Sequence, residues 1–136
     1  ARLIGLDVLD ESGEPASTIL NGASVTVRVR VRYEAAVADP VIGILIRTRI
    51  GVEVYGTNTE LEQVQMPPCQ AGDIRTISFR FACSLCPGSY TITAASHDPD
   101  GVWHDWLEDA ILFTVAGTRY TAGVADLRAS VTCSRE

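Results

Sequence analysis

Residues 97–106 hold most of the side chains in this sequence that could do chemistry. They include both histidines, both tryptophans and three aspartates. Imidazole and carboxylate groups bind several divalent metal ions, so a metal-dependent enzyme built on the loop His97–Asp105 is one hypothesis. Asp98-Pro99-Asp100-Gly101 lacks the later ligands of an EF-hand and also fits a tight turn with solvated carboxylates. We therefore expect no metal and no cofactor.

The tryptophans of this segment favour binding over catalysis. We expect one of them to anchor the core and the other to offer a flat exposed ring. Sugars pack their C–H faces on aromatic rings, and their hydroxyls need polar side chains nearby. Trp103 is thus a candidate for stacking on a ligand, and His104 for an orienting hydrogen bond.

Common catalytic motifs are missing from the sequence. It contains no G-x-S-x-G and no H-E-x-x-H, and all eleven basic residues are arginines. The absence of lysine excludes a phosphate-loop lysine, a Schiff base and a lysine general base. We expect a protein that is not an enzyme.

The four cysteines leave several alternatives open. Cys83 and Cys86 have the C-x-x-C spacing of a zinc knuckle or a redox pair. A zinc site would need Cys69 and Cys133 as the remaining ligands, and a redox motif would begin a helix, whereas Pro87 and a strand pattern follow here. Free buried thiols are the simpler interpretation.

Alternation of apolar and polar residues indicates the fold class. In Val25–Tyr33, valines alternate with Thr26 and three arginines, which is typical of a strand with one buried face. Further strands are predicted, with turn residues between them, at Leu3–Leu9, Val41–Ile50, Val52–Thr57, Ile74–Ala82, Ser89–Ser96, Ala110–Val115 and Leu127–Cys133. No segment keeps a period of 3.6. The sequence predicts an all-β protein, a two-sheet antiparallel β-sandwich of the immunoglobulin-like or jelly-roll kind.

The last predicted strand, Leu127–Cys133, comes after the sheets could already be complete. Such a strand either closes an edge of its own sheet or adds to the edge of a neighbour.

Outward-facing arginines form a second group that could bind a ligand. Arg47 and Arg49 follow Ile44 and Ile46 and should point away from the core. If their strand shared a sheet with Val25–Tyr33, five guanidinium groups would lie on one face: Arg28, Arg30, Arg32, Arg47 and Arg49. Guanidinium forks bind carboxylates, phosphates and vicinal hydroxyls. The alternative is a solvated face whose arginines pair with acidic residues such as Glu34, Glu53, Glu60 or Glu62.

Composition limits the class of partner. The net charge of −6 argues against nucleic acid, and no apolar run is long enough to cross a bilayer. A chain of 136 residues suits one domain, residues 1–136. Because Ala1 runs straight into a strand pattern, we expect a domain cut from a longer chain.

The segment Gly43–Thr59 carries a resemblance to a known family. Its Arg47-Thr48-x-x-Gly51 and Gly56-Thr57-Asn58-Thr59 stretches resemble the C-terminal carbohydrate-binding domain of the ATP-binding subunit of O-antigen polysaccharide ABC transporters (Wzt-type). Shorter pieces agree in order: Asp10–Gly13, Asn21–Val25, Leu85–Tyr90 and Phe113–Val115.

The resemblance implies a β-sandwich in the cytoplasm, at the inner face of the inner membrane. It implies binding of an O-antigen-type polysaccharide, near its non-reducing end, to select and gate export. The implied partners are the transporter membrane subunit, reached through the parent chain, and a second copy in a homodimer that could exchange the last strand. The ATPase domain that precedes this domain in the family is absent here.

Members of the family recognise different glycans, so the ligand residues are proposed from this sequence alone. We expect Arg47 and Arg49 to bind acidic or hydroxyl groups, Tyr55 and Trp103 to stack, and Asn58 and His104 to orient the ligand. The rival hypothesis is a structural or dimerisation module of a larger protein, with no glycan ligand.

Overall fold

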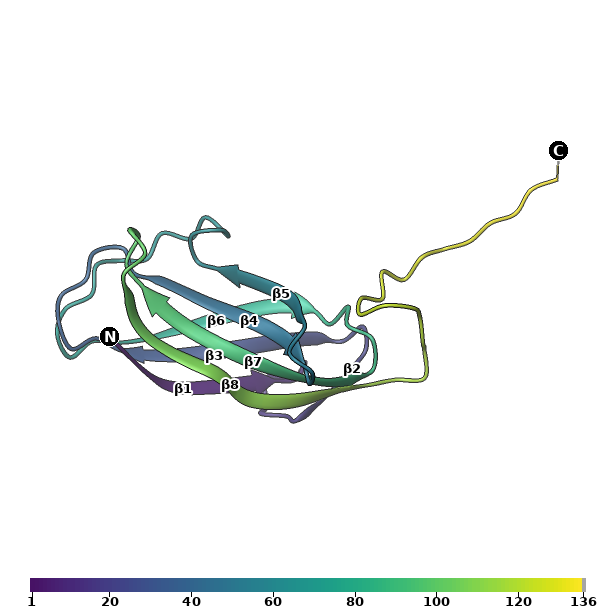
Figure 1. Ribbon diagram of the computed structural model, residues 1–136, viewed down its shortest axis with the longest axis horizontal. Coiled ribbons are helices and arrows are strands. Elements are labelled where there is room, and N and C mark those ends of the chain that lie inside the picture. The colour runs from purple at the N-terminus through teal and green to yellow at the C-terminus, as the bar shows by residue number, and fades with distance from the viewer. Residues whose placement is uncertain (136) are drawn as a thin grey trace.

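The structure is a computed structural model that describes residues 1–135, and these fold into eight strands (Figure 1). The strands are β1 (Arg2–Leu9), β2 (Thr18–Leu20), β3 (Ser24–Arg32), β4 (Val41–Thr48), β5 (Glu53–Asn58), β6 (Ile74–Ala82), β7 (Gly88–His97) and β8 (Trp103–Ala116). None of the described residues forms a helix long and apolar enough to cross a membrane.

The strands make two facing sheets, as predicted. One has three strands in the order β1-β3-β6, and the other has five in the order β2-β8-β7-β4-β5. All neighbours run antiparallel except β2 and β8, which pair in parallel through three residues each. The expectation of an all-β, two-sheet sandwich is confirmed. Within residues 1–135 its antiparallel character is broken only at β2, which is too short to show a pattern in the sequence.

The core lies between the sheets and is built from inward-facing aliphatic side chains. The four valines of β3, residues 25, 27, 29 and 31, are buried, and they share one cluster with Ile44, Ile46 and Ile92 of the facing sheet. Burying each such side chain stabilises the fold by about 1.5–3 kcal/mol. The valine pattern of β3 therefore fixes which face of its sheet is dry.

Strand β8 is longer than the sequence suggested. Its fourteen residues begin at Trp103, whereas a polar loop from His97 to Asp105 was expected. The loop is only the short hairpin between β7 and β8, in which Gly101 N donates to Asp98 O at 2.9 Å. Two register shifts in the β7–β8 pair interrupt the alternation of β8, which hid the strand from pattern analysis.

The predicted last strand is wrong for the isolated chain. Residues 127–133 form no strand, and the side chains of Leu127 and Val131 are 84% and 90% exposed. Figure 1 shows this C-terminal arm (residues 127–135) leaving the sandwich. A strand needs a neighbour for its backbone groups, and the arm has none within the described part of this chain.

A buried carboxylate holds the root of the arm. Asp126 is 1% exposed and accepts hydrogen bonds from Arg128 N at 2.9 Å and Arg119 Nε at 3.0 Å. The bond from Arg128 N, with the charge of Arg119, lowers the pKa of Asp126. Arg128 Nη2 also donates to Asn21 O at 2.9 Å, in the turn before β3. Gly22, at φ 88°, leaves the space that this guanidinium occupies, because a Cβ there would clash with Arg128 Nη2.

The cysteines are free thiols in the structure. Cys69, Cys83 and Cys86 are buried, and Cys133 is exposed on the C-terminal arm. Burial raises the pKa of Cys83, which disfavours the reactive thiolate. Within residues 1–135 no group of three or more His, Cys, Asp or Glu side chains is arranged to hold a metal ion.

Tyr33 provides a test of the core. It is fully buried, and burial, aided by the nearby Cys69, raises the pKa of its phenol to about 12. An unfolded tyrosine ionises near pH 10, so between about pH 10 and 12 the folded state holds a proton that the unfolded state releases. Stability should therefore fall as the pH rises through this window, by up to about 3 kcal/mol from Tyr33 alone. Urea unfolding at pH 8, 10 and 11.5 should show a shallower decline for Tyr33→Phe than for the wild type. The exposed-site variant Tyr120→Phe serves as control, and identical slopes for Tyr33→Phe and wild type would contradict the assignment.

Candidate functional site

The polar candidates gather mainly on the outer face of the five-stranded sheet. Here "outer face" means the side chains of β5, β4, β7 and β8 that point away from the core. The strand register places Asn58, Gly43, Ala95 and Trp106 in one row across these four strands. Trp103 pairs with His97 in the next row.

Two tryptophans and a histidine form an aromatic cluster at one end of the outer face. The rings of Trp103 and Trp106 meet edge to face with centroids 4.9 Å apart, and His97 lies 4.9 Å from Trp103. Trp103 is 56% and Trp106 43% exposed, so the expectation that one tryptophan anchors the core is wrong. The cluster offers large apolar ring surface to a ligand.

Trp106 was not among the predicted site residues. In a regular strand, residues three apart point to opposite faces. His97 pairs with Trp103 and Ser96 with Asp105, so β8 has one extra residue, His104, at this point. The extra residue brings both tryptophans to the same face. Only the pairing of β7 with β8 reveals this.

The row from Trp106 to Asn58 has small residues at its centre. Gly43 and Ala95 lie between the indole ring and the asparagine side chain. A Cβ on Gly43 would lie 3.1 Å from Asn58 Cβ, so the glycine keeps the space beside Asn58 open. Asn58 Oδ1 accepts a bond from Leu61 N at 2.7 Å, which orients the side chain and leaves its amide nitrogen as the donor for a ligand.

His104 ties the hairpin to β7. Its Nε2 lies 2.6 Å from Asp98 Oδ1 and its Nδ1 3.2 Å from Ser96 Oγ. Both ring nitrogens are thus occupied. A direct bond from His104 to a ligand would have to replace one of them, whereas the present bonds position the strand that carries Trp103.

Arg47 is held by neighbouring side chains. Its Nη1 lies 3.1 Å from Thr93 Oγ1 and 3.4 Å from both Glu108 Oε1 and Asp109 Oδ1. Its Nη2 lies 3.8 Å from Glu53 Oε1, and the side chain is 14% exposed. Of the two alternatives for this residue, pairing with carboxylates is the one seen.

The condition for a face of five arginines, that the strands of Arg28–Arg32 and Arg47 share a sheet, is not met. Strands β3 and β4 belong to different sheets, so Arg28, Arg30 and Arg32 lie on the opposite outside of the sandwich from Arg47. Arg28 forms an ion pair with Asp7 of β1 at 3.0 Å. The sequence alone could not assign strands to sheets, and this assignment decides which arginines come together.

Two further candidates lie apart from the aromatic cluster. Arg49 is exposed in the turn after β4, and the length of that strand separates it from Trp103 by roughly 25 Å. Tyr55 pairs with the buried Ile46 and so points inward, with its ring 6.0 Å from Phe81. Arg47, Asn58 and Trp103 share the outer face, and Tyr55 and Arg49 do not join them.

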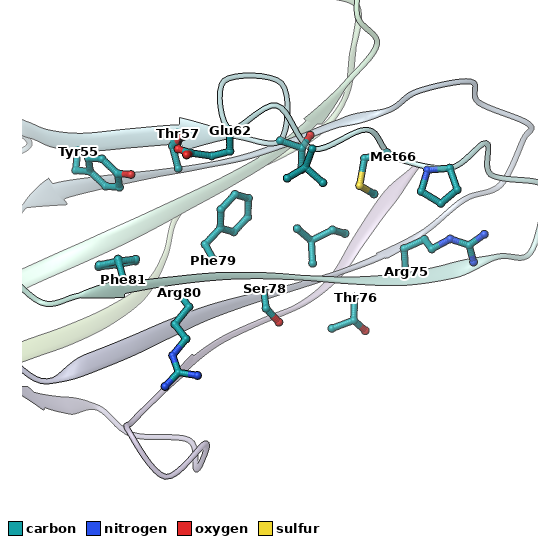
Figure 2. Close-up of a pocket in the computed structure, with 14 residues that line it drawn as sticks. Tyr55, Thr57, Glu62, Met66, Arg75, Thr76, Ser78, Phe79, Arg80 and Phe81 are labelled. Carbon is teal, nitrogen blue, oxygen red and sulfur yellow. Dashed lines mark hydrogen bonds between the residues drawn. The ribbon is translucent and has the colours of Figure 1, made fainter.

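Tyr55 lines a groove of about 490 Å³ between the edge strands β5 and β6 (Figure 2). Phe79 points into it, while Thr76, Ser78 and Arg80 point away from it (Figure 2). At its rim Thr57 donates to Glu62 Oε2 at 2.6 Å. The groove is apolar and runs beside β6, which is an edge strand of the three-stranded sheet.

Comparisons with known proteins agree with this architecture. A family model described as the Wzt C-terminal domain matches residues 1–127. A crystal structure of the C-terminal domain of Wzt superposes with a TM-score of 0.91 at 24% sequence identity, over 98% of this chain and 83% of that one. The search of curated proteins found no match.

A more distant structural match shows only a similar sandwich. It is a β-glucosidase from Listeria innocua in complex with gluconolactone, with a TM-score of 0.50 and 15% identity. The match covers 85% of this chain but 16% of the enzyme chain. The family match extends over nearly all of the sequence, and its fold is the one described above. This chain belongs to the Wzt C-terminal domain family.

Proposed function

We propose that this domain binds an O-antigen-type polysaccharide without chemical conversion, and thereby selects and gates its export by an ABC transporter. The observation that carries the proposal is the row of Trp106, Ala95, Gly43 and Asn58 beside Trp103. The row combines exposed aromatic rings at one end, small residues at its centre that leave space for a ligand, and an amide donor at the other end. These are the features that a sugar, apolar on its ring faces and polar at its hydroxyls, requires.

The dimensions of the row fit a short stretch of glycan. Neighbouring strands lie about 4.8 Å apart, so Trp106 and Asn58, three strand spacings from each other, are separated by about 14 Å. A sugar stacked on the indole can extend over Ala95 and Gly43 toward the amide of Asn58. We expect the bound part to be close to the non-reducing end of the polysaccharide.

Binding of this kind is weak. Exposed hydroxyls exchange bonds with water for bonds with protein, and the net gain in free energy is small. Weak binding suits a module that must release the polysaccharide once export proceeds.

We extend the proposal to the rest of the assembly. Residues 1–136 form one domain of a longer chain whose ATPase domain precedes it, and that chain joins the transporter membrane subunit at the cytoplasmic face of the inner membrane. Three buried free thiols suit a reducing compartment. The negative net charge disfavours nucleic acid as a partner.

Homodimerisation through the C-terminal arm is supported by two features. The arm carries apolar side chains at Leu127, Ala129, Val131 and Cys133, which would share one face of a strand. The unpaired edge of β6 and the groove that contains Phe79 offer a place for such a strand. Residues 127–133 would then form the predicted last strand only when paired with a second copy.

The same arm supports the rival function, a dimerisation module without a glycan ligand. In that case the aromatic cluster would be a solvated surface. The metal-dependent enzyme has less support, because His104 and Asp98 bond to each other within the hairpin.

The first test of glycan binding uses the tryptophans. Trp106→Ala and Trp103→Ala should each weaken binding of the polysaccharide from the source strain about tenfold, or about 1.4 kcal/mol, because each removes apolar ring surface that a sugar would bury. Binding is measured by NMR titration, with circular dichroism to confirm folding. Tyr120→Ala, which removes an exposed aromatic ring elsewhere, should bind as the wild type does. Unchanged affinity in both tryptophan variants would remove the aromatic cluster from the site.

The second test concerns the arm. Deleting residues 127–136 should convert the dimer to a monomer, because it removes the exchanged strand, while glycan affinity per chain stays the same. Sedimentation velocity measures the oligomeric state. A full-length domain that is monomeric at all concentrations, or a truncated one that stays dimeric, would show that the arm does not join the two copies.

A further inference from the structure

We infer that the outer face is an electrostatic filter that admits uncharged glycan residues and rejects acidic ones. This inference rests on the proposed glycan binding and names the chemical class of sugar seated on the aromatic cluster. It also revises the expectation that Arg47 binds acidic groups.

The charges around Arg47 do not cancel. Three carboxylates, those of Glu53, Glu108 and Asp109, lie within 3.8 Å of one guanidinium. The sum is two excess negative charges. The carboxylates are more exposed to solvent than the guanidinium, whose side chain is 14% exposed, so a ligand meets the acidic groups first.

Arg47 is not free to turn toward an acidic ligand. It bonds to Thr93 Oγ1, and the same Thr93 oxygen accepts a bond from Asp109 N at 2.9 Å. Thr91 Oγ1 donates to Asp109 Oδ1 at 2.8 Å, which fixes the carboxylate in place. If Arg47 swung outward, Glu108 and Asp109 would be left facing each other without the cation between them. The guanidinium acts as a positioning group for the bulge of β8.

This acidic group lies next to the proposed glycan row. Thr93 is two residues before Ala95 on β7, and Glu108 is two residues after Trp106 on β8. Two residues along a strand span about 7 Å, so the acidic group lies about 7 Å from the row, within the Debye length at physiological salt. A carboxylate or phosphate on a sugar stacked against Trp106 would feel the excess charge.

Arg28, Arg30 and Arg32 belong to the opposite sheet and bring no positive charge to the row. Arg49 is exposed two residues beyond Arg47, but it is six residues, roughly 20 Å, from Gly43 in the row. In the hairpin between β7 and β8, Asp98 adds a further carboxylate beside His104. Neutral hydroxyl groups can bond to this surface, whereas acidic sugars are repelled.

The experiment changes the charge of one polymer while keeping its backbone. The probes are the O-polysaccharide purified from the source strain, the same polymer with part of its primary hydroxyls oxidised to carboxylates, and that oxidised polymer after methyl esterification. The ester separates the effect of charge from the loss of a hydroxyl. Affinities for the whole domain are measured by NMR titration at 0.05 M and 0.5 M NaCl.

We expect oxidation to weaken binding about tenfold at low salt, since like charges brought together oppose association. Esterification should restore most of the loss, and 0.5 M NaCl should shrink the difference, because the Debye length falls to about 4 Å. The double variant Glu53→Gln/Glu108→Gln should bind the oxidised polymer more tightly than the wild type does. Glu14→Gln, which removes an exposed carboxylate outside the group around Arg47, is the matched control and should not.

The outcomes separate this inference from the proposed function. Equal or tighter binding of the oxidised polymer would overturn the filter and leave glycan binding intact. A native polysaccharide that is itself acidic, and that loses affinity when its carboxyl groups are reduced, would do the same. Failure of every form to bind would overturn the proposed function, and the filter with it.

Discussion

Packing of the β3 valines against the isoleucines of β4 and β7 is the contact on which the rest of the structure depends. It fixes the dry side of both sheets, and because side chains alternate along a strand, it also fixes what each strand presents to solvent. The core also determines which residues of β4 and β7 face outward. Gly43, Arg47, Thr93 and Ala95 point to solvent because their neighbours along the strand are required in the core.

The strands without bulges were predictable from the sequence, because burial of one face imposes a two-residue period on them. Strand β6 has the predicted bounds, and β3 differs by a single residue at either end. Strand β8 was recognised only in part, because an extra residue at His104 and the bulge near Asp109 shift the period twice. Alternation also cannot say which strands are neighbours, and for that reason the sequence left open whether the five arginines share one face, which they do not.

The candidate site was predictable in its residue types but not in its arrangement. The segment 97–106 was correctly marked as the richest in aromatic and polar side chains, yet Trp106 came to the same side as Trp103 only through the extra residue in β8. The environment of Arg47 was predictable only in part: Glu53 was among the acidic partners considered, whereas Glu108 and Asp109 come from β8, far away in the sequence. From the sequence, Arg47 was a candidate for binding an anion. In the structure three carboxylates surround it, and it stabilises the bulge of β8 instead.

Gly22 lies where the turn before β3 meets the root of the C-terminal arm. It allows the backbone to turn into β3, and the space it leaves is occupied by the guanidinium of Arg128 at the root of the C-terminal arm. The root of the arm is therefore tied to the turn before β3. A side chain added at Gly22 would displace the guanidinium and cost its bonds to Asn21, so a contact at the root of the arm depends on a residue that no partner needs to touch.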